Sequence, residues 1–226
     1  MLKYDEFIEK VNDAGFWTPF TNYIDQEIFK FAWDGCNLKG QAYLGDSETD
    51  PETWKTRVPQ EKKLAYGYFF NGKPGGYIAP RFYSIFIDAF RPRMTVEERY
   101  ESGKLGKYEK GIWDLLNQYG KPLSWSDFRL ILKSDAKNKV ELRKLDSAIK
   151  CLQMTFDITV SGTEGNMGCD KVDNWIPLEW LKMNPRMEHD EALETIYRQA
   201  EKISNAGDAK KAFTKSLKLY KMYDAH

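Results

Sequence analysis

Several carboxylates lie close in sequence to a tryptophan in the N-terminal half of the chain. Asp50, Glu52 and Glu61 flank Trp54, and a carboxylate beside an aromatic pocket is what acid–base chemistry on an extruded base requires. Helix capping explains Asp50 and Glu52 more simply, because Pro51 begins a helical pattern there. The residues of this candidate pocket are Asp50, Trp54, Arg57, Glu61 and Lys73.

Cysteine and histidine offer little for nucleophilic or metal chemistry. Cys36, Cys151 and Cys169 are an odd number and no two are close in sequence, which fits a reducing compartment better than a disulfide framework. With only His189 and His226 present, a zinc-type cluster and a Ser–His or Cys–His pair are both disfavoured. We therefore expect neither a metal nor a cofactor.

A basic helix face is the candidate for binding a polyanion. The 3.6-residue period predicts a helix from about residue 137 to residue 152. Residues 121–151 contain eight basic and four acidic residues, against three and nine in residues 152–197, so the positive charge is local. Such a face suits a DNA major groove, and a solvated surface is an equally good interpretation. The predicted nucleic-acid-binding residues are Lys137, Lys139, Arg143, Ser147 and Lys150.

The elements that must position this face lie between Leu105 and Leu181. A first helix, over about 104–118, stops at Gly120, and Ser124 with Asp127 forms the pattern of a capping box for a second helix. After the basic helix, residues 155–160 alternate as a strand, a Gly-rich tip covers 161–168, and 170–176 form a return strand. This order is that of a winged helix-turn-helix. The strand's predicted inward residues are Phe156, Ile158 and Val160, and its outward residues are Thr155, Asp157 and Thr159.

The wing of this module is acidic, unlike wings that reach phosphates with Lys or Arg. It carries Glu164, Asp170 and Asp173, with only Lys171 on the basic side. We therefore expect any nucleic acid to contact the helix and the C-terminal tail, with the wing held away. The tail lysines could touch phosphates nonspecifically, although a solvated terminal helix is the simpler interpretation; they are Lys210, Lys211, Lys215, Lys218 and Lys221.

The predicted fold class is α+β and mainly helical, with the winged-helix module packed on an aromatic-rich, mostly helical N-terminal domain. The predicted boundaries are 1–100 for that domain, 101–182 for the winged helix and 183–226 for a C-terminal helical extension. In the first segment, helical patterns cover residues 4–14 and 80–90, and Asn71–Gly72 is typical of a tight hairpin turn.

Composition indicates a folded protein without revealing its partner. The 226 residues are 42% hydrophobic and 15% aromatic, and the formal net charge is +0, so a case for nucleic acid must come from local patches. There is no run of 18 apolar residues, and the charged N-terminus lacks the apolar core of a signal peptide. We expect a cytoplasmic protein without a membrane partner.

Three stretches carry a family resemblance. The runs TDPETWK, LAYGYFFNGKPGGYI and YGKPLSWSDFR…LDSAIKCLQMTFDITVSG resemble the AlkZ-related bacterial proteins, a branch near the winged-helix DNA glycosylases. The resemblance covers most of residues 1–182 and implies a winged-helix scaffold, DNA as the partner and a role near DNA repair. The Gln-x-Gln or Gln-x-Asp motif of the glycosylases is absent from this sequence.

Three hypotheses follow. The first is a nucleic-acid-binding winged-helix protein related to the repair glycosylases but without their motif. The second is a divergent base-excision enzyme using the candidate pocket. The third is a module that binds a protein or a small ligand on a winged-helix scaffold, which the acidic wing and the zero net charge favour. The sequence leaves open whether the protein is an enzyme, and it leaves the oligomeric state open.

Overall fold

Helices connected by two small antiparallel sheets make up this protein, which is the mainly helical α+β class that the sequence predicts. The computed structural model describes residues 3–17, 48, 50–70, 75–132, 138–162, 167–203 and 209–224. Of the candidate site residues, Lys73 and Lys137 lie outside these ranges.

The N-terminal elements surround a three-stranded sheet. They are α1 (Tyr4–Ala14), β1 (Phe16–Trp17), α3 (Pro51–Gln60), β2 (Ala65–Gly67) and β3 (Gly76–Ile78). The sheet order is β1-β3-β2, and both pairings are antiparallel. The predicted hairpin therefore joins neighbouring strands, although Asn71–Gly72 itself lies outside the described residues.

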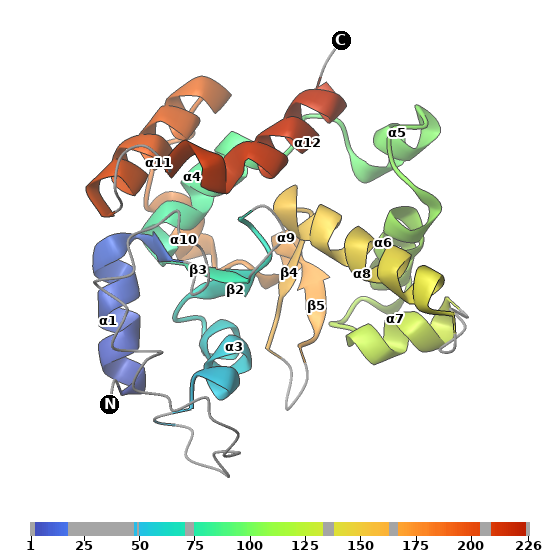
Figure 1. The fold of residues 1–226 in the computed structure, drawn as a ribbon, viewed down its shortest axis with the longest axis horizontal. Coiled ribbons are helices and arrows are strands. Elements are labelled where there is room, and N and C mark those ends of the chain that lie inside the picture. Colours follow the sequence, from blue (N-terminus) through green and yellow to red (C-terminus); the bar gives the residue numbers. More distant parts are fainter. Residues whose placement is uncertain are drawn as a thin grey trace.

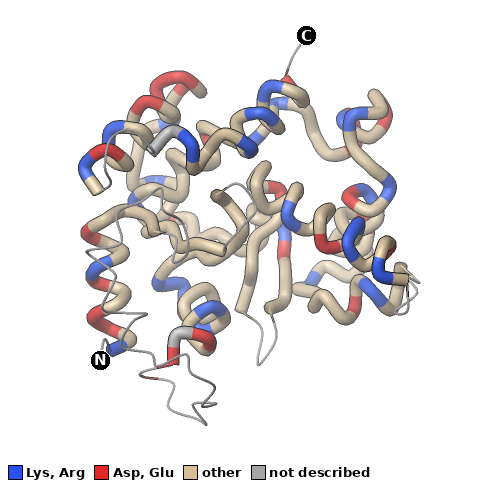
Figure 2. Tube along the Cα trace, viewed as in Figure 1, with Lys and Arg blue, Asp and Glu red and all other residues tan. Residues whose placement is uncertain are grey.

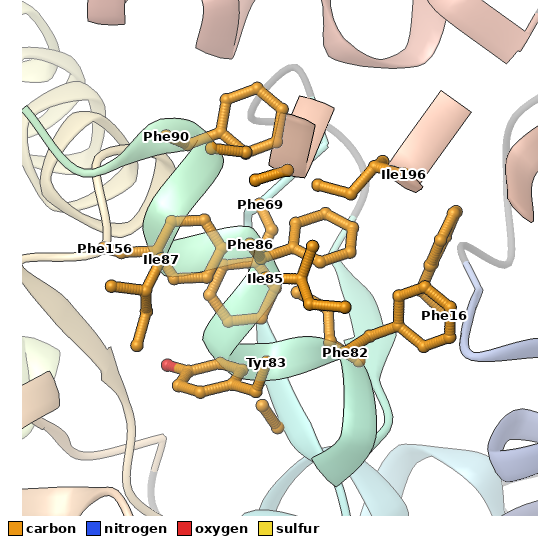
Figure 3. Close-up of a cluster of buried hydrophobic side chains, with 14 of the residues drawn as sticks. Phe16, Phe69, Phe82, Tyr83, Ile85, Phe86, Ile87, Phe90, Phe156 and Ile196 are labelled. Carbon is orange, nitrogen blue, oxygen red and sulfur yellow. The ribbon is translucent and has the colours of Figure 1, made fainter. Parts of the chain in front are cut away.

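A buried aromatic helix, α4 (Pro80–Phe90), is the centre of the largest core. It packs against α10 (Leu178–Lys182), α11 (His189–Ile203) and α12 (Thr214–Asp224), and the short η1 (Ala209–Phe213) joins the last two. Figure 1 shows α11 and α12 beside α4 at one end of the molecule. The aromatic side chains of α4 pack against rings from distant segments, including Phe16, Phe69 and Phe156 (Figure 3).

The helices α5 to α8 group on the opposite side of the view from α1 (Figure 1). The elements in chain order are α5 (Val96–Glu101), α6 (Lys107–Tyr119), α7 (Trp125–Ile131), α8 (Lys139–Met154), β4 (Ile158–Val160), β5 (Cys169–Lys171) and α9 (Val172–Trp175). β4 and β5 pair antiparallel, and Leu123 forms a bridge with Cys169 before α7 begins. Gly120 ends α6 with a left-handed φ of 60°, as its place in the sequence predicts.

Two details of the predicted hairpin are wrong. The sequence predicts that Thr155, Asp157 and Thr159 face outward, but all three are buried. Thr155 donates a hydrogen bond to the last turn of α8, Asp157 pairs with Arg99 of α5, and β4, which contains Thr159, packs against β2. The return strand, expected over 170–176, ends at Lys171 and continues as α9. A helical turn places Val172 and Trp175, three residues apart, into the same core, which strand alternation would not do.

The cores cross the predicted boundaries. The core around α4 contains Phe16 from the first segment, Phe156 from the second and Phe213 from the third. A second core joins α1 and α3 to Val160 of β4, and a third, under α6 and α8, includes Tyr223 of α12. None of the described helices combines the length and apolarity needed to cross a bilayer.

Candidate nucleic-acid interface

Helix α8 has one buried face and one charged face. Asn138 begins it by accepting hydrogen bonds from the amides of Val140 and Glu141 at 3.0 and 3.3 Å, which satisfies two donors of the first turn. The helical period predicts one apolar face for this helix, and its residues pack under α6, except that Leu142 is only half-buried; the buried ones are Leu145, Ala148, Ile149 and Leu152. This packing leaves the other side of the helix to solvent.

The predicted binding residues lie on that exposed side. Lys139, Arg143 and Ser147 are exposed, and Lys150 is half-buried, while Lys137 lies outside the described residues. Figure 2 shows basic residues along α8 and α12. The acidic residue on this face, Asp146, is 3.3 Å from Nη2 of Arg129 on α7. The carboxylate is therefore offset by a cation from the neighbouring helix, and the face keeps its positive character.

Two aromatic side chains extend this face beyond Lys150. The Nζ atom of Lys150 lies 4.7 Å from the ring centroid of Tyr68, and the rings of Tyr68 and Trp125 are 6.1 Å apart. Both aromatic residues are half-buried. Burial first, and then the nearby Asp146 carboxylate, raise the pKa of the Tyr68 hydroxyl, so the ring stays neutral at physiological pH. Aromatic rings beside cations are the combination that stacks bases and holds phosphates.

A buried glutamine fixes the position of Tyr68. Gln153 of α8 is fully buried, and its Oε1 accepts a hydrogen bond from the Tyr68 amide at 2.8 Å, while its Nε2 lies 3.5 Å from the Sγ of Cys169. Sequence reasoning missed Tyr68 and Trp125, because Tyr68 is 82 residues before Lys150 and only the tertiary fold brings them together.

The C-terminal helix lies close to the same region. Ser216 of α12 donates a hydrogen bond to the carbonyl of Phe69 at 2.9 Å, next to Tyr68, and the Tyr223 hydroxyl is 3.3 Å from the Sγ of Cys151 on α8. The tail lysines at 211, 215, 218 and 221 are exposed, and the side chain of Lys210 lies outside the described residues. The fold therefore brings the basic tail next to the end of α8.

The predicted pocket residues take structural positions in and beside α3. Asp50 caps α3 by accepting the Glu52 amide at 3.0 Å, and Trp54 is 1% exposed, with its ring stacked on Phe7 at 4.8 Å. Lys73 lies outside the described residues. Asp50 therefore caps α3, as the simpler interpretation of the sequence predicts. Trp54 belongs to the hydrophobic core.

Arg57 and Glu61 do come together, as an ion pair closed by Tyr4. Glu61 accepts hydrogen bonds from Nε of Arg57 at 2.8 Å and from the Tyr4 hydroxyl at 2.9 Å. Burial pushes the pKa of Glu61 upward, but the bonds from Arg57 and Tyr4 outweigh it and leave the pKa below its usual value. A carboxylate held ionised by two donors is a weak base.

The part of the chain that the structure describes offers neither a metal cluster nor a reactive thiol. No cluster of three His, Cys, Asp or Glu residues could hold a metal there. Burial raises the pKa of the Cys151 thiol to about 11 and that of Cys169 to about 12, so neither is a thiolate at neutral pH.

A cavity of about 750 Å³ lies between α11, α12 and the segment after α4. The ring of His189 stacks on Tyr220 there, with centroids 3.8 Å apart, and its Nδ1 is 2.8 Å from the carbonyl of Ala89. Charges of both signs surround the cavity: Arg93 and Lys221 against Glu98, Glu188, Asp190 and Asp224. Its mixed charge does not match a phosphate backbone.

Comparison with known proteins gave one match. The sequence model of a family described as AlkZ related matches residues 1–218. No curated protein and no solved structure matches the chain.

Proposed function

Because the chain belongs to the AlkZ-related family, which is linked to DNA-repair glycosylase-like proteins, we propose that it binds DNA through the exposed face of α8. The glutamines of the sequence form no Gln-x-Gln or Gln-x-Asp motif, so we limit this function to binding. In this interpretation residues 105–181 are a winged helix, with α8 as the helix that enters the major groove.

The order and pairing of the elements support the winged-helix interpretation. Helix α6, the bridge at Leu123, the helices α7 and α8, and the β4–β5 pair follow one another, and the bridge joins Leu123 to β5. This arrangement ties the segment that precedes α7 to the sheet.

The exposed row of Lys139, Arg143 and Ser147 carries the proposal. These side chains come from one side of a helix whose opposite side is core, so the helix can present them without unfolding. Arginine can pair bidentately with guanine, and lysine and serine reach phosphates or base edges. Tyr68 and Trp125 add stacking surface at the end of the row.

Salt-dependent binding to duplex DNA tests this function. In fluorescence anisotropy with a labelled duplex, log affinity should fall linearly with log salt, with a slope near −0.9 for each phosphate neutralised. The double variant Lys139→Ala, Arg143→Ala should flatten that slope by up to about two units and weaken binding.

The matched control removes two positive charges elsewhere. Lys10 on α1 and Lys202 on α11 are exposed, and their double alanine variant should bind as the wild type does. An absence of duplex binding at about 50 mM salt, or equal losses in the two double variants, would refute the role of α8.

A further inference from the structure

A separate cavity of about 320 Å³ lies where the end of α3, the residues that follow β4, β5 and α9 meet. Its lining includes Lys62, Ser161, Gly162, Asp170, Asn174 and Trp175. In β5, Asp170 points to the opposite side of the strand from its neighbour Cys169, which packs in the core under α6 and α8. The cavity is therefore distinct from the interface on α8.

Two residues with positive φ line this cavity, where two segments of backbone approach closely. Lys62 has a φ of 56°, and among the described residues it shares a positive φ outside glycine only with Phe156. Gly162 lines the same cavity with a φ of 74°, and a Cβ there would clash with the Thr56 carbonyl oxygen, so the chain just after β4 abuts the backbone of α3. The positive φ of Lys62 belongs to the C-cap of α3, because the amides of Lys62 and Lys63 donate back to the carbonyls of Pro59 and Val58 at 3.4 and 3.0 Å. This cap fixes where the Lys62 side chain leaves the helix.

The amine of Lys62 is held against an indole. Its Nζ donates a hydrogen bond to the carbonyl oxygen of Trp175 at 2.8 Å and lies 4.0 Å from the Trp175 ring centroid. Burial lowers the pKa of Lys62 to about 8, and the attraction of Asp170 only partly opposes this effect. A much larger share of this amine is therefore unprotonated at neutral pH than for an ordinary lysine.

A fixed carboxylate accompanies the amine. Asp170 is 8% exposed, and its Oδ1 accepts hydrogen bonds from the Lys171 amide at 2.7 Å and from Nδ2 of Asn174 at 3.3 Å. These bonds orient the carboxyl group in a wall of the cavity that Lys62 also lines. Sequence reasoning treated Asp170 only as an acidic wing residue, because nothing in the local pattern connects it with Lys62, 108 positions earlier.

We propose that Lys62 is an amine nucleophile that forms an imine with an aldehyde bound in this cavity, with Asp170 as the group that moves protons. The Nζ lone pair attacks the carbonyl carbon, and one proton passes from nitrogen through the Asp170 carboxylate to the carbonyl oxygen, which gives a neutral carbinolamine. A second proton, delivered by the Asp170 carboxyl group, converts the hydroxyl into water, the carbon–oxygen bond breaks and an iminium forms. Nitrogen then returns a proton to Asp170 as the neutral imine forms. The amine gives up its hydrogen bond to Trp175 in this step.

Reductive trapping tests the proposal on the whole protein. The wild type is incubated near neutral pH with cyanoborohydride and either glycolaldehyde or an oligonucleotide that contains an abasic site, and adducts are mapped by mass spectrometry. Lys63, the exposed neighbour, is the internal control. We expect Lys62 to be trapped at least about 10-fold faster than Lys63, as its larger unprotonated fraction requires.

The two arms separate two sources of the same carbonyl chemistry. Preferential trapping at Lys62 with glycolaldehyde identifies a free small aldehyde, and trapping only with the oligonucleotide identifies the sugar of damaged DNA. Labelling of Lys62 no faster than Lys63 in both arms would overturn the proposal. The glycolaldehyde arm needs no DNA, so its result is independent of the proposed function.

The variant Asp170→Asn tests the proton transfer. We expect trapping at Lys62 to slow by at least about 10-fold, because general acid–base catalysis contributes that much or more, while trapping at Lys63 stays the same. Circular dichroism checks that the variant is folded. Unchanged trapping at Lys62 in a folded variant would show that Asp170 takes no part in the proton transfer. The comparison of Lys62 with Lys63 uses the wild type alone, so it does not depend on the folding of this variant.

Discussion

At the residue scale, the strongest buried electrostatic contact joins two parts of the chain far apart in sequence. Nη2 of Arg99 lies 2.6 Å from Oδ1 of Asp157, and the two side chains are 1% and 8% exposed. Asp157 also accepts the Thr155 hydroxyl at 2.5 Å, and the Arg99 guanidinium lies 4.9 Å from the ring centroid of Tyr223. The pair therefore connects α5, the start of β4 and α12.

Removing one charge of this pair should be costly. We expect Asp157→Asn to lower the free energy of unfolding by about 3–5 kcal/mol, because it leaves the Arg99 cation buried without its counterion. Urea denaturation measures the loss. Glu194→Gln is the control, since Glu194 and Arg198 form an exposed pair on α11, and it should cost under about 1 kcal/mol. Similar losses in both variants would contradict this account of the buried pair.

Tyr68 should contribute stacking without contributing charge. We expect Tyr68→Leu to weaken binding of a duplex with an unpaired overhanging base by about 1–3 kcal/mol while the salt slope stays the same, because stacking on that base is lost and no phosphate contact is. Tyr119 on α6 is 45% exposed, and Tyr119→Leu is the matched control. A changed slope in Tyr68→Leu, or an equal loss in Tyr119→Leu, would show that Tyr68 does not act by stacking.

At the element scale, the start of α7 depends on a reciprocal cap. The Ser124 hydroxyl accepts the Asp127 amide at 3.1 Å, and Oδ2 of Asp127 accepts the Ser124 amide at 2.7 Å. The hydrogen bond from the Ser124 side chain, and then that from its backbone, hold the pKa of Asp127 below its ordinary value. The ionised form is thus favoured by folding.

This cap should give a defined pH dependence. A carboxylate whose pKa is lower in the folded protein than in the unfolded protein stabilises the fold fully above its unfolded pKa, near 3.8. This stabilisation is lost as the pH falls through the pKa of the folded protein. We therefore expect Asp127→Asn to be less stable than the wild type at pH 7, with the difference shrinking below about pH 4. Urea denaturation across this range measures it. Ser126→Ala, an exposed change in the same turn, should show no such trend.

Elements defined by local chemistry could be predicted from the sequence, and those defined by distant contacts could not. The Ser124–Asp127 box, the stop at Gly120 and the Asp50 cap each depend on residues within four positions of one another, and all three are present. The burial of Thr159 and the helical turn of α9 depend on α4 and on residues of the N-terminal half packed against the hairpin, which the local period cannot reveal.

The same limit applies to the candidate sites. The exposed row on α8 follows from helical periodicity, and the structure places Lys139, Arg143 and Ser147 as expected. The proximity of Tyr68 to Lys150 and the shared cavity of Lys62 and Asp170 arise from tertiary packing alone. Cavities form between elements that are distant in sequence, so local sequence patterns give no direct signal for them.

At the scale of the whole molecule, the cores join all three predicted segments. We expect the fragment 101–182 not to fold alone, because Phe156, Trp175 and Trp180 would lose their partners on α4. Circular dichroism and a dye that binds exposed apolar surface should show a loosely packed fragment, while the full chain unfolds in one transition. Cooperative unfolding of the isolated fragment would instead support independent domains.

The bond between Gln153 and Tyr68 has a consequence for how a duplex would be recognised. Gln153 fixes α8 from inside, to the loop at Tyr68 and to Cys169 of β5, so the helix has little freedom to rotate or slide toward a partner. A duplex docked on α8 would have to do most of the adjusting. The sequence preference of such a complex would then reflect how easily each base step bends, in addition to which bases the side chains touch.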